Sequence, residues 1–232
     1  MMKLAFLLLL AAVPLRADLA SQVRGVSGWA GYSVPIADGR HVLCSWESTT
    51  IESHRETASG SLLVLYEVAD GSVRSVRVSS PECRATKQIH WIQGVDPRES
   101  VRFLRALVDD DDVSRKALTA LALHRGVEDD LIRVARDHAS ASVRGHALFW
   151  VSQHAGEKAA AALRQAVDND PETRVKEKAV FGISQLPDER SIPMLIDLMK
   201  THRNAAVRKK AAFWLGQKND PRALAAFEDI LR

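Results

Sequence analysis

The chain contains few of the residues from which common catalytic sites are built. Among its 232 residues, Cys44 and Cys83 are the only cysteines, and aromatic residues make up 6%. It has no Gly-x-Ser-x-Gly segment, no phosphate-cradling glycine loop and no paired zinc motif. Because the usual catalytic signatures are absent, we assign no catalytic residue, no metal site and no cofactor from the sequence.

Long hydrophobic runs are also missing, apart from one at the start of the chain. Lys3 precedes an unbroken apolar run over residues 4–13, which Pro14 and the small Ala17 follow. The run is too short to span a bilayer, which takes about 20 residues, and the pattern is typical of a secretory signal peptide over residues 1–17. We expect cleavage near Ala17, a periplasmic or secreted mature protein, and no stable membrane span.

A strong excess of one charge is missing as well. The chain carries 32 basic and 29 acidic residues, and Lys3 and Arg16 belong to the expected signal peptide. The mature chain is therefore close to neutral, and its basic sequence pI is no argument for a nucleic-acid partner.

The two cysteines are interpreted through the expected compartment. In an oxidising compartment, an isolated pair forms a structural disulfide more often than a reactive thiol or a metal site. We therefore predict a Cys44–Cys83 disulfide. In the loop-entropy model a bridge that closes about 40 residues contributes about 4 kcal/mol.

Residues 18–94 are expected to form a small antiparallel β domain. Asp70-Gly71 suits a tight hairpin turn, and Asp38-Gly39 suits a turn between two earlier strands. Five short strands make a small sheet but not a large independent core, so the disulfide and the following helices would complete it. The expected strands cover residues 29–36, 41–46, 61–68, 73–78 and 89–92, the last with Trp91 directed inward.

Two sets of side chains in this β segment allow a structural or a functional interpretation. Aromatic residues could line a platform for a carbohydrate or peptide, but in a small domain they more often form the core. They are Trp29, Tyr32, Trp46, Tyr66 and Trp91. The loop 47–60 contains Glu52, His54 and Glu56, which have the side-chain types of a metal site. Because no second cluster accompanies them, we interpret this loop as solvated.

Residues 95–232 are expected to form an α-solenoid. Asp96-Pro97 suits the start of a helix, so residues 96–108 are interpreted as a half repeat. Four full repeats follow, starting at about residues 112, 142, 174 and 206. Counted from a valine in each first helix, positions 0, 4, 7 and 8 form one stripe that must be buried. The valines are Val113, Val143, Val175 and Val207, and alanine stands four positions after each.

These units resemble short HEAT-like repeats of the kind also found in phycobilin lyases. The residues that carry the resemblance are Val143-Arg144, Val175-Lys176, Val207-Arg208, Ala211-Ala212, Leu215-Gly216 and the Asp-Pro-Arg-Ala-Leu of residues 220–224. The resemblance covers about residues 96–232 and implies a scaffold that binds proteins or peptides. A β segment followed by such repeats also resembles a group of exported bacterial HEAT proteins.

The enzymatic branches of HEAT-like proteins do not fit this chain. The metal-binding hydroxylase branch uses His-Glu pairs, and the chain contains no His-Glu dipeptide. His138, His146 and His154 are spaced by eight, but two of them lie over two turns apart along one expected helix. We therefore interpret them as surface or helix-end residues rather than metal ligands.

Two columns of residues outside the buried stripe are the candidate binding surface. Helical geometry directs the position six after each valine away from the buried stripe. Its phenylalanines would form either an apolar ridge, typical of an interaction site, or packing against the next repeat. The position three after each valine is mostly basic, with Arg144, Lys176 and Arg208 nearby, and would meet an acidic partner or stay solvated. The candidate residues are Phe149, Phe181, Phe213, Lys178 and Lys210.

We therefore expect an α+β protein in which a small disulfide-bridged antiparallel β domain precedes an α-solenoid of HEAT-like helix pairs. Its expected function is that of an exported, non-catalytic scaffold of the cell envelope that binds a protein or peptide. The alternative is an enzyme or cofactor carrier with a site at the junction of the β domain and the solenoid. Because the ends of a solenoid need a polar cap, we also expect self-association through the uncapped C-terminal repeat.

Overall fold

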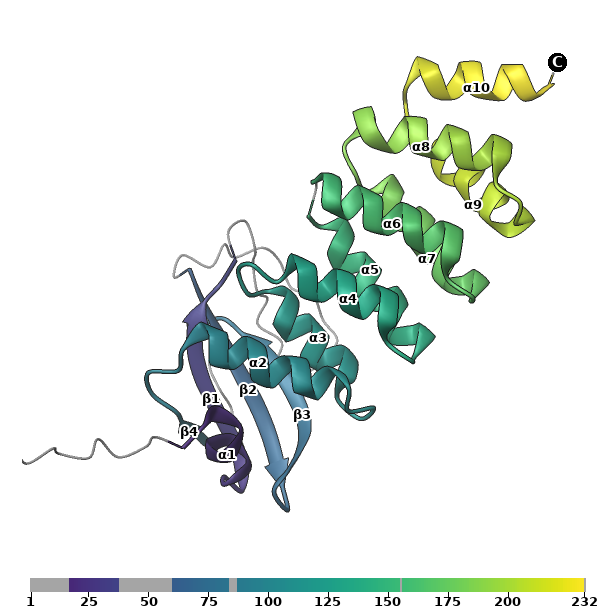
Figure 1. The fold of residues 1–232 in the computed structure, drawn as a ribbon. Coiled ribbons are helices and arrows are strands. Elements are labelled where there is room, and N and C mark those ends of the chain that lie inside the picture. The colour runs from purple at the N-terminus through teal and green to yellow at the C-terminus, as the bar shows by residue number, and fades with distance from the viewer. Residues whose placement is uncertain (1–16, 38–59, 84–86, 155, 232) are drawn as a thin grey trace, which may run out of the picture.

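The structure, a computed structural model, describes residues 17–37, 60–83, 87–154 and 156–231. A four-stranded sheet lies at the N-terminal side, and the helices that follow it stack away from the sheet toward the C-terminus (Figure 1). The described part of the chain is therefore an α+β fold in which a sheet precedes a helical repeat region.

The sheet has the strand order β3-β2-β1-β4. Its strands are β1 (Gly28–Pro35), β2 (Ser61–Ala69), β3 (Ser72–Ser79) and β4 (Ile89–Trp91). β1 pairs antiparallel with β2 and parallel with β4, so the sheet is mixed. The prediction of a purely antiparallel sheet is therefore wrong. The expected turn joins β2 to β3. Asp70 and Gly71 have φ angles of 52° and 69°, the left-handed conformation that a two-residue hairpin loop requires.

Several sequence predictions fall on residues outside the described ranges. They are the signal peptide up to residue 16, the strand at residues 41–46, and the loop with Glu52, His54 and Glu56. Cys44 also lies outside, so the Cys44–Cys83 disulfide stays a prediction. Cys83 follows β3, and the described ranges contain no free cysteine.

Two helices, α1 (Leu19–Arg24) and α2 (Pro97–Val108), border the sheet. The Asp96 carboxylate caps α2 by accepting a 2.7 Å hydrogen bond from the amide of Arg98, and Pro97 opens the helix as predicted. α1 was not expected, because residues from Ser21 onward were interpreted as β. Asp18 caps α1, which buries Leu19 and Val23.

The aromatic residues of the β segment do not share one role. Tyr32 and Tyr66 are buried against the helices, and the Tyr66 ring centroid lies 5.3 Å from that of Phe103 in α2. The prediction that Trp91 points inward is wrong, because 44% of its surface is exposed. Trp91 lies over Gly31 on the opposite face of β1, where an added Cβ would be 3.3 Å from the Trp91 ring. Trp46 lies outside the described ranges, and of the described aromatic residues in this segment the two tyrosines belong to the core beneath the helices.

The remaining helices form four pairs, in which a first helix precedes a second. The first and second helices make two rows that run side by side along the repeat region (Figure 1). The first helices are α3 (Ser114–Ala122), α5 (Ala141–Ser152), α7 (Thr173–Ser184) and α9 (Ala205–Leu215). The second helices are α4 (Glu128–Asp137), α6 (Glu157–Asn169), α8 (Asp188–Thr201) and α10 (Pro221–Leu231).

The buried stripe of the first helices agrees with the prediction. The four alanines at the fourth position are completely buried, which lets neighbouring first helices approach closely. At the seventh position Gly182 is also buried, and a Cβ there would lie 2.5 Å from a methyl group of Leu163. Trp150 and Trp214 occupy the same position in other repeats and are half-buried. The core of the helical region therefore runs between the two rows of helices.

Candidate functional site

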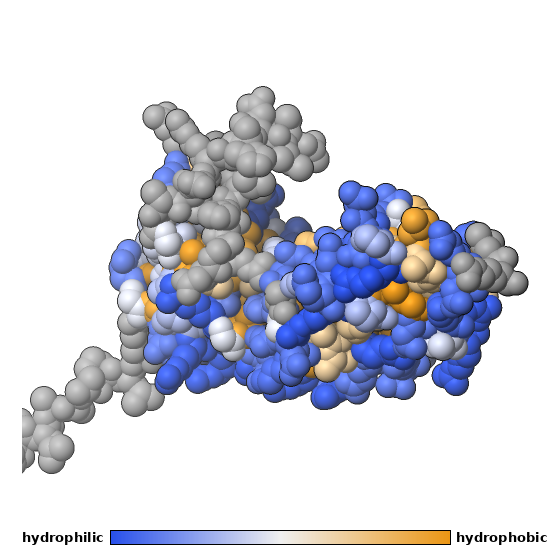
Figure 2. Space-filling view, turned by 90° about the horizontal axis from the view of Figure 1, so that it is seen from above, coloured by the Kyte–Doolittle hydropathy of each residue, from blue (hydrophilic) through white to orange (hydrophobic). Residues whose placement is uncertain are grey.

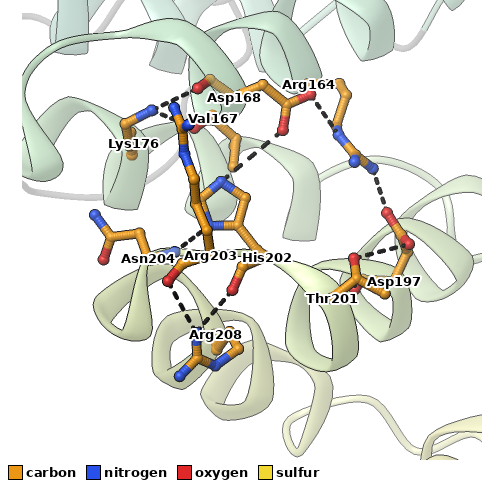
Figure 3. A network of polar contacts seen from close by, with 10 residues as sticks. All are labelled: Arg164, Val167, Asp168, Lys176, Asp197, Thr201, His202, Arg203, Asn204 and Arg208. Atoms are coloured by element: carbon orange, nitrogen blue, oxygen red, sulfur yellow. Dashed lines mark hydrogen bonds and ion pairs between the residues drawn. The ribbon is translucent and has the colours of Figure 1, made fainter.

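The basic residue that follows the valine in three repeats is part of the fold rather than of the binding surface. In each case its side chain donates hydrogen bonds to carbonyl groups at the end of the preceding second helix, and Figure 3 shows two of these ends. Arg144 contacts His138 and Ala139, Lys176 contacts Val167 and Asp168, and Arg208 contacts His202 and Arg203. Arg144 and Lys176 are buried. From the sequence we placed these three residues near a face that would meet an acidic partner. That prediction is wrong, because their side chains point into the turns between helices.

Arg144 makes the strongest of these contacts because it also meets an acidic side chain. Its guanidinium donates two hydrogen bonds, of 2.8 and 3.0 Å, to the two carboxylate oxygens of Asp170. Burial alone would raise the pKa of Asp170, but the hydrogen bonds from Arg144 and from the amide of Glu172 lower it below its ordinary value. The pair therefore joins the turns before α5 and α7 as a buried ion pair.

One of the histidines considered in the sequence analysis, His138, has a role in the same turns, and so does His202, which the sequence analysis did not single out. His138 and His202 occupy the position of Asp170 in their own repeats, and each accepts a hydrogen bond from the amide two residues later. The opposite ring nitrogen of His138 donates to the carbonyl of Val108 at 3.1 Å. These histidines therefore close turns. Within the described ranges, no group of three or more His, Cys, Asp and Glu side chains could hold a metal ion.

The predicted phenylalanine column lies on the outer surface of the first helices. Phe149 and Phe213 are 38% and 54% exposed, whereas Phe181 is half-buried. The Phe181 ring lies 5.0 Å from the ring of Trp214 in the next repeat, and the Phe213 ring lies 5.0 Å from the same indole on its own helix. Phe181 therefore packs between repeats while Phe149 and Phe213 present apolar rings to the surface.

Cationic side chains stand beside these rings. Lys178 is exposed, and its aliphatic stem lies over Gly145 of the previous repeat, where a Cβ would come within 2.4 Å of it. The Lys210 ammonium lies 5.9 Å from the centre of the Phe213 ring. In the equivalent position His146 has a lowered pKa because of burial and of the nearby charges of Arg115 and Lys178. The basic column therefore runs directly alongside the phenylalanines.

A third column was missed in the sequence. Gln153, Gln185 and Gln217 stand ten positions after the valines, and all three are exposed. Their spacing of 32 residues is the signal that would have revealed them. Together the three columns form what we call the Lys-Phe-Gln face, whose members are His146, Phe149 and Gln153, then Lys178, Phe181 and Gln185, then Lys210, Phe213 and Gln217.

The junction between the sheet and the repeats contains a buried chain of hydrogen bonds. The Nδ1 atom of His124 lies 2.9 Å from the carbonyl of Ala120 and must donate to it. Burial lowers the pKa of His124, so the ring is neutral and its Nε2 accepts from Ser100 at 2.7 Å. The Tyr32 hydroxyl then donates to Ser100 at 2.7 Å, and that of Tyr66 donates to Tyr32 at 2.6 Å.

This chain of hydrogen bonds fastens the two parts of the fold together. Burial raises the pKa of Tyr32 to about 12 and that of Tyr66 well above its ordinary value, so both stay protonated. Ser100 is completely buried, and a substrate has no access to its hydroxyl. The Ser100–His124 contact therefore stabilises the junction and is not a nucleophile with its base.

A comparison with known families matches the same region. A family model described as HEAT repeats matches residues 128–202 and residues 160–232. Residues 128–232 are therefore similar to HEAT repeats. The HEAT match begins at Glu128, so α2 and α3 are assigned to the array by their packing in the structure. No curated protein matches the chain significantly.

HEAT repeats are typically non-catalytic scaffolds for protein interactions, which agrees with the exposed Lys-Phe-Gln face of this HEAT-like array. Figure 2 shows a mostly hydrophilic surface interrupted by separate hydrophobic patches. None of the helices in the described ranges has the length and apolar character needed to cross a bilayer.

Proposed function

We propose that the protein is a peptide-binding scaffold and that the Lys-Phe-Gln face docks an acidic, partly apolar peptide. The observation that carries the proposal is the repetition of exposed residues. Packing requires the valines and alanines to recur, but it does not require an exposed Phe149 and Phe213, or the exposed glutamines, to recur. A ligand contact shared by the last three repeats accounts for them.

The position two after each valine shows the contrast. Three repeats hold Arg115, Glu177 and Lys209 there, whereas Gly145 of the remaining repeat is buried beneath the Lys178 stem. The residue type at this position therefore differs from repeat to repeat. Phenylalanine and glutamine therefore recur because of a role of the Lys-Phe-Gln face. The repeat as a whole does not require them.

The charge of the face indicates the chemistry of the peptide. Lys178, Lys209 and Lys210 border the phenylalanines of α7 and α9, and Glu177 is the one acidic residue in the columns two and three positions after the valines. Carboxylates of a peptide would pair with the lysines while its apolar side chains cover Phe149 and Phe213, which removes apolar surface from water.

The spacing of the repeats suggests how such a peptide would lie. Packed helices are about 8–10 Å apart, and an extended chain advances about 3.3 Å per residue. One repeat therefore corresponds to about three peptide residues, and an acidic residue and an apolar residue in every three would match the face.

The test uses two labelled peptides of equal length, one built from repeated Glu-Leu-Ser and the other from repeated Lys-Leu-Ser. Fluorescence anisotropy should show binding of the acidic peptide alone. A double variant with Phe149→Ser and Phe213→Ser should weaken binding by about tenfold or more, because burying an aromatic ring contributes about 1.5–3 kcal/mol. The matched control is Leu224→Ser, which removes a 63% exposed leucine from α10. Equal binding of both peptides, or equal losses in both variants, would exclude the proposal.

Export to the cell envelope is part of the same proposal, and the apolar run at residues 4–13 supports it. Mass spectrometry of protein from the periplasmic fraction should give a chain that starts near Asp18 and lacks thiols. Maleimide should then label Cys44 and Cys83 only after denaturation with reductant. Labelling of both cysteines in the denatured, unreduced protein would show that the bridge is absent.

A further inference from the structure

A pocket lies where the sheet meets the first helices, away from the Lys-Phe-Gln face. One wall is α2, another is the turn at Arg125 and Gly126 between α3 and α4, and Pro35 at the end of β1 stands on its rim. Its volume is about 530 Å³, which falls within the range of about 300–1,000 Å³ that is typical of small-molecule sites.

Among the residues that the structure describes, the pocket is lined by four arginines and one carboxylate, that of Asp130. Three of the arginines, Arg98, Arg102 and Arg105, follow one another at spacings of four and three along α2, which brings them onto one face of that helix. Asp96 and Glu99, the acidic residues nearest to them in sequence, do not line the pocket. The described lining therefore contains more arginines than carboxylates.

Two of the arginines are held in place by the protein itself. Arg105 forms an ion pair with the buried Asp130, which also lies 3.7 Å from Arg133. Arg125 donates a 3.2 Å hydrogen bond to the carbonyl of Ile36. These contacts orient two guanidinium groups before a ligand arrives, so less side-chain entropy is lost on binding.

The other two arginines are available to a ligand. Within the described ranges, the guanidinium groups of Arg98 and Arg102 have no hydrogen-bond or ion-pair partner, and both residues are exposed at the pocket. Guanidinium groups bind carboxylates and phosphates through two parallel hydrogen bonds. Val101 and Val127 supply apolar wall between the charged groups. The first turn of α2 adds the partial positive charge of a helix N-terminus.

We propose that this pocket binds a small organic anion, with Arg98 and Arg102 pairing with its carboxylate or phosphate group and Val101 and Val127 contacting its apolar body. The proposal is independent of peptide binding, because the two sites share no residue. The ligand chemistry is that of an oxyanion on a compact carbon skeleton.

The test is isothermal titration of the full mature chain with phenyl phosphate, benzoate, inorganic phosphate and, as a neutral control, benzyl alcohol. Phenyl phosphate or benzoate should saturate one site, and the stronger of the two identifies the anionic group. Inorganic phosphate should bind more weakly than phenyl phosphate because it lacks the apolar body. Benzyl alcohol should not bind. Absence of saturable binding by either aromatic anion at millimolar concentration would overturn the proposal.

The site is assigned by variants of the unpartnered arginines. The double variant Arg98→Gln and Arg102→Gln should weaken binding by about tenfold or more, because the anion loses its charge-assisted hydrogen bonds to both guanidinium groups. Arg174→Gln, which removes an exposed arginine from α7, is the matched control and should leave affinity unchanged. The single variant Arg102→Gln serves if the double variant fails to fold. Equal affinity in the wild type and in the variant of Arg98 and Arg102, or of Arg102 alone, would place the anion elsewhere.

The position of the bound anion can also be found without substituting a residue. In amide NMR spectra, addition of the anion should shift the signals of Gly126 and Val127 at the pocket and leave those of Phe149 and Phe213 unchanged. Shifts confined to the Lys-Phe-Gln face would contradict the proposal. They would show that the anion binds the lysines there, while the peptide-binding proposal would remain open to its own test.

Discussion

The indole N–H of Trp150 donates a 3.2 Å hydrogen bond to Nε2 of His146, one helical turn earlier. Trp214 occupies the same position two repeats later, but the residue four positions before it is Lys210, whose ammonium group cannot accept a hydrogen bond. Within the described ranges, the Trp214 indole nitrogen is buried without a partner. One repeat therefore satisfies its tryptophan and the other leaves a polar group unpaired.

We predict that Lys210→His stabilises the protein by about 1 kcal/mol, because a buried donor gains an acceptor. The substitution removes the Lys210 contact with the Phe213 ring, but at 5.9 Å this contact lies near the outer limit of such interactions and contributes little. Urea denaturation at neutral pH measures the change. The reverse substitution, His146→Lys, removes the acceptor that Trp150 uses and should destabilise by a similar amount. An unchanged midpoint in both variants would contradict the explanation.

The hydrogen-bond chain at the junction predicts that Tyr32→Phe destabilises the protein more than Tyr66→Phe. Tyr32 lies in the middle and contacts both Tyr66 and Ser100, whereas Tyr66 lies at the end. Tyr32→Phe therefore interrupts two hydrogen bonds and leaves a buried hydroxyl on either side, at a cost of about 1–3 kcal/mol for each unsatisfied group. Tyr66→Phe removes only one donor and should cost less. Denaturation followed by tyrosine and tryptophan fluorescence compares the two, and a larger loss for Tyr66→Phe would show that the chain does not run as described.

Stability should also depend on pH through the same chain. Burial lowers the pKa of His124 below its ordinary value of 6.5. As the pH falls below 6.5, the unfolded chain therefore binds a proton that the folded protein does not, and the free energy of unfolding decreases. His146, whose pKa is also lowered mainly by burial, adds to the effect.

We expect the wild-type protein to lose stability between pH 7 and pH 5, and His124→Gln to lose less over the same interval. Urea titrations at several pH values provide the measurement. His146→Gln is the companion variant and should reduce the slope further when combined with His124→Gln. Equal slopes in wild type and His124→Gln would mean that the pKa of His124 is the same in the folded and the unfolded protein.

The buried pair of Arg144 and Asp170 provides a further prediction. Their side chains are 8% and 5% exposed, so removing one leaves a buried charge without its partner. Arg144→Met should cost about 3–5 kcal/mol, and it also releases the carbonyls of His138 and Ala139. The double variant with Asp170→Leu should cost less than the sum of the two single variants, because no lone charge remains. Additive losses in calorimetry would contradict a direct coupling.

The helices of the repeats could be predicted from the sequence because each repeat solves the same packing problem. A valine and an alanine at fixed positions in every first helix are required wherever two such helices meet, so the period and the buried stripe are visible in one chain. The side chains that cross between repeats were harder to predict. Phe181 points away from the buried stripe of its own helix, yet it packs on Trp214 of the next repeat. That contact depends on how the repeats stack.

The errors have similar physical causes. Arg144 and Lys176 were assigned to the surface because their side chains are charged. The carbonyl groups that they contact belong to the backbone, which is the same for every residue type, so the sequence gives no sign of these contacts. Trp91 lies on a strand of three residues, where alternation is too short to show which face is buried, and its exposure follows from the parallel pairing of β4 with β1. α1 has only six residues and was marked by little more than the cap at Asp18.

The alanines between first helices have a mechanical consequence for the array. The first helices α5, α7 and α9 pack closely against one another through these alanines, whereas the second helices α4 and α6 make less contact with each other. The second helices are also bridged by exposed ion pairs, such as Lys158 with Asp129 and Arg164 with Asp197. Salt screens such pairs but leaves packed alanines unaffected. The array should therefore bend about the row of first helices, which the alanines hold close together. Ionic strength should change this bending through the spacing of the second helices.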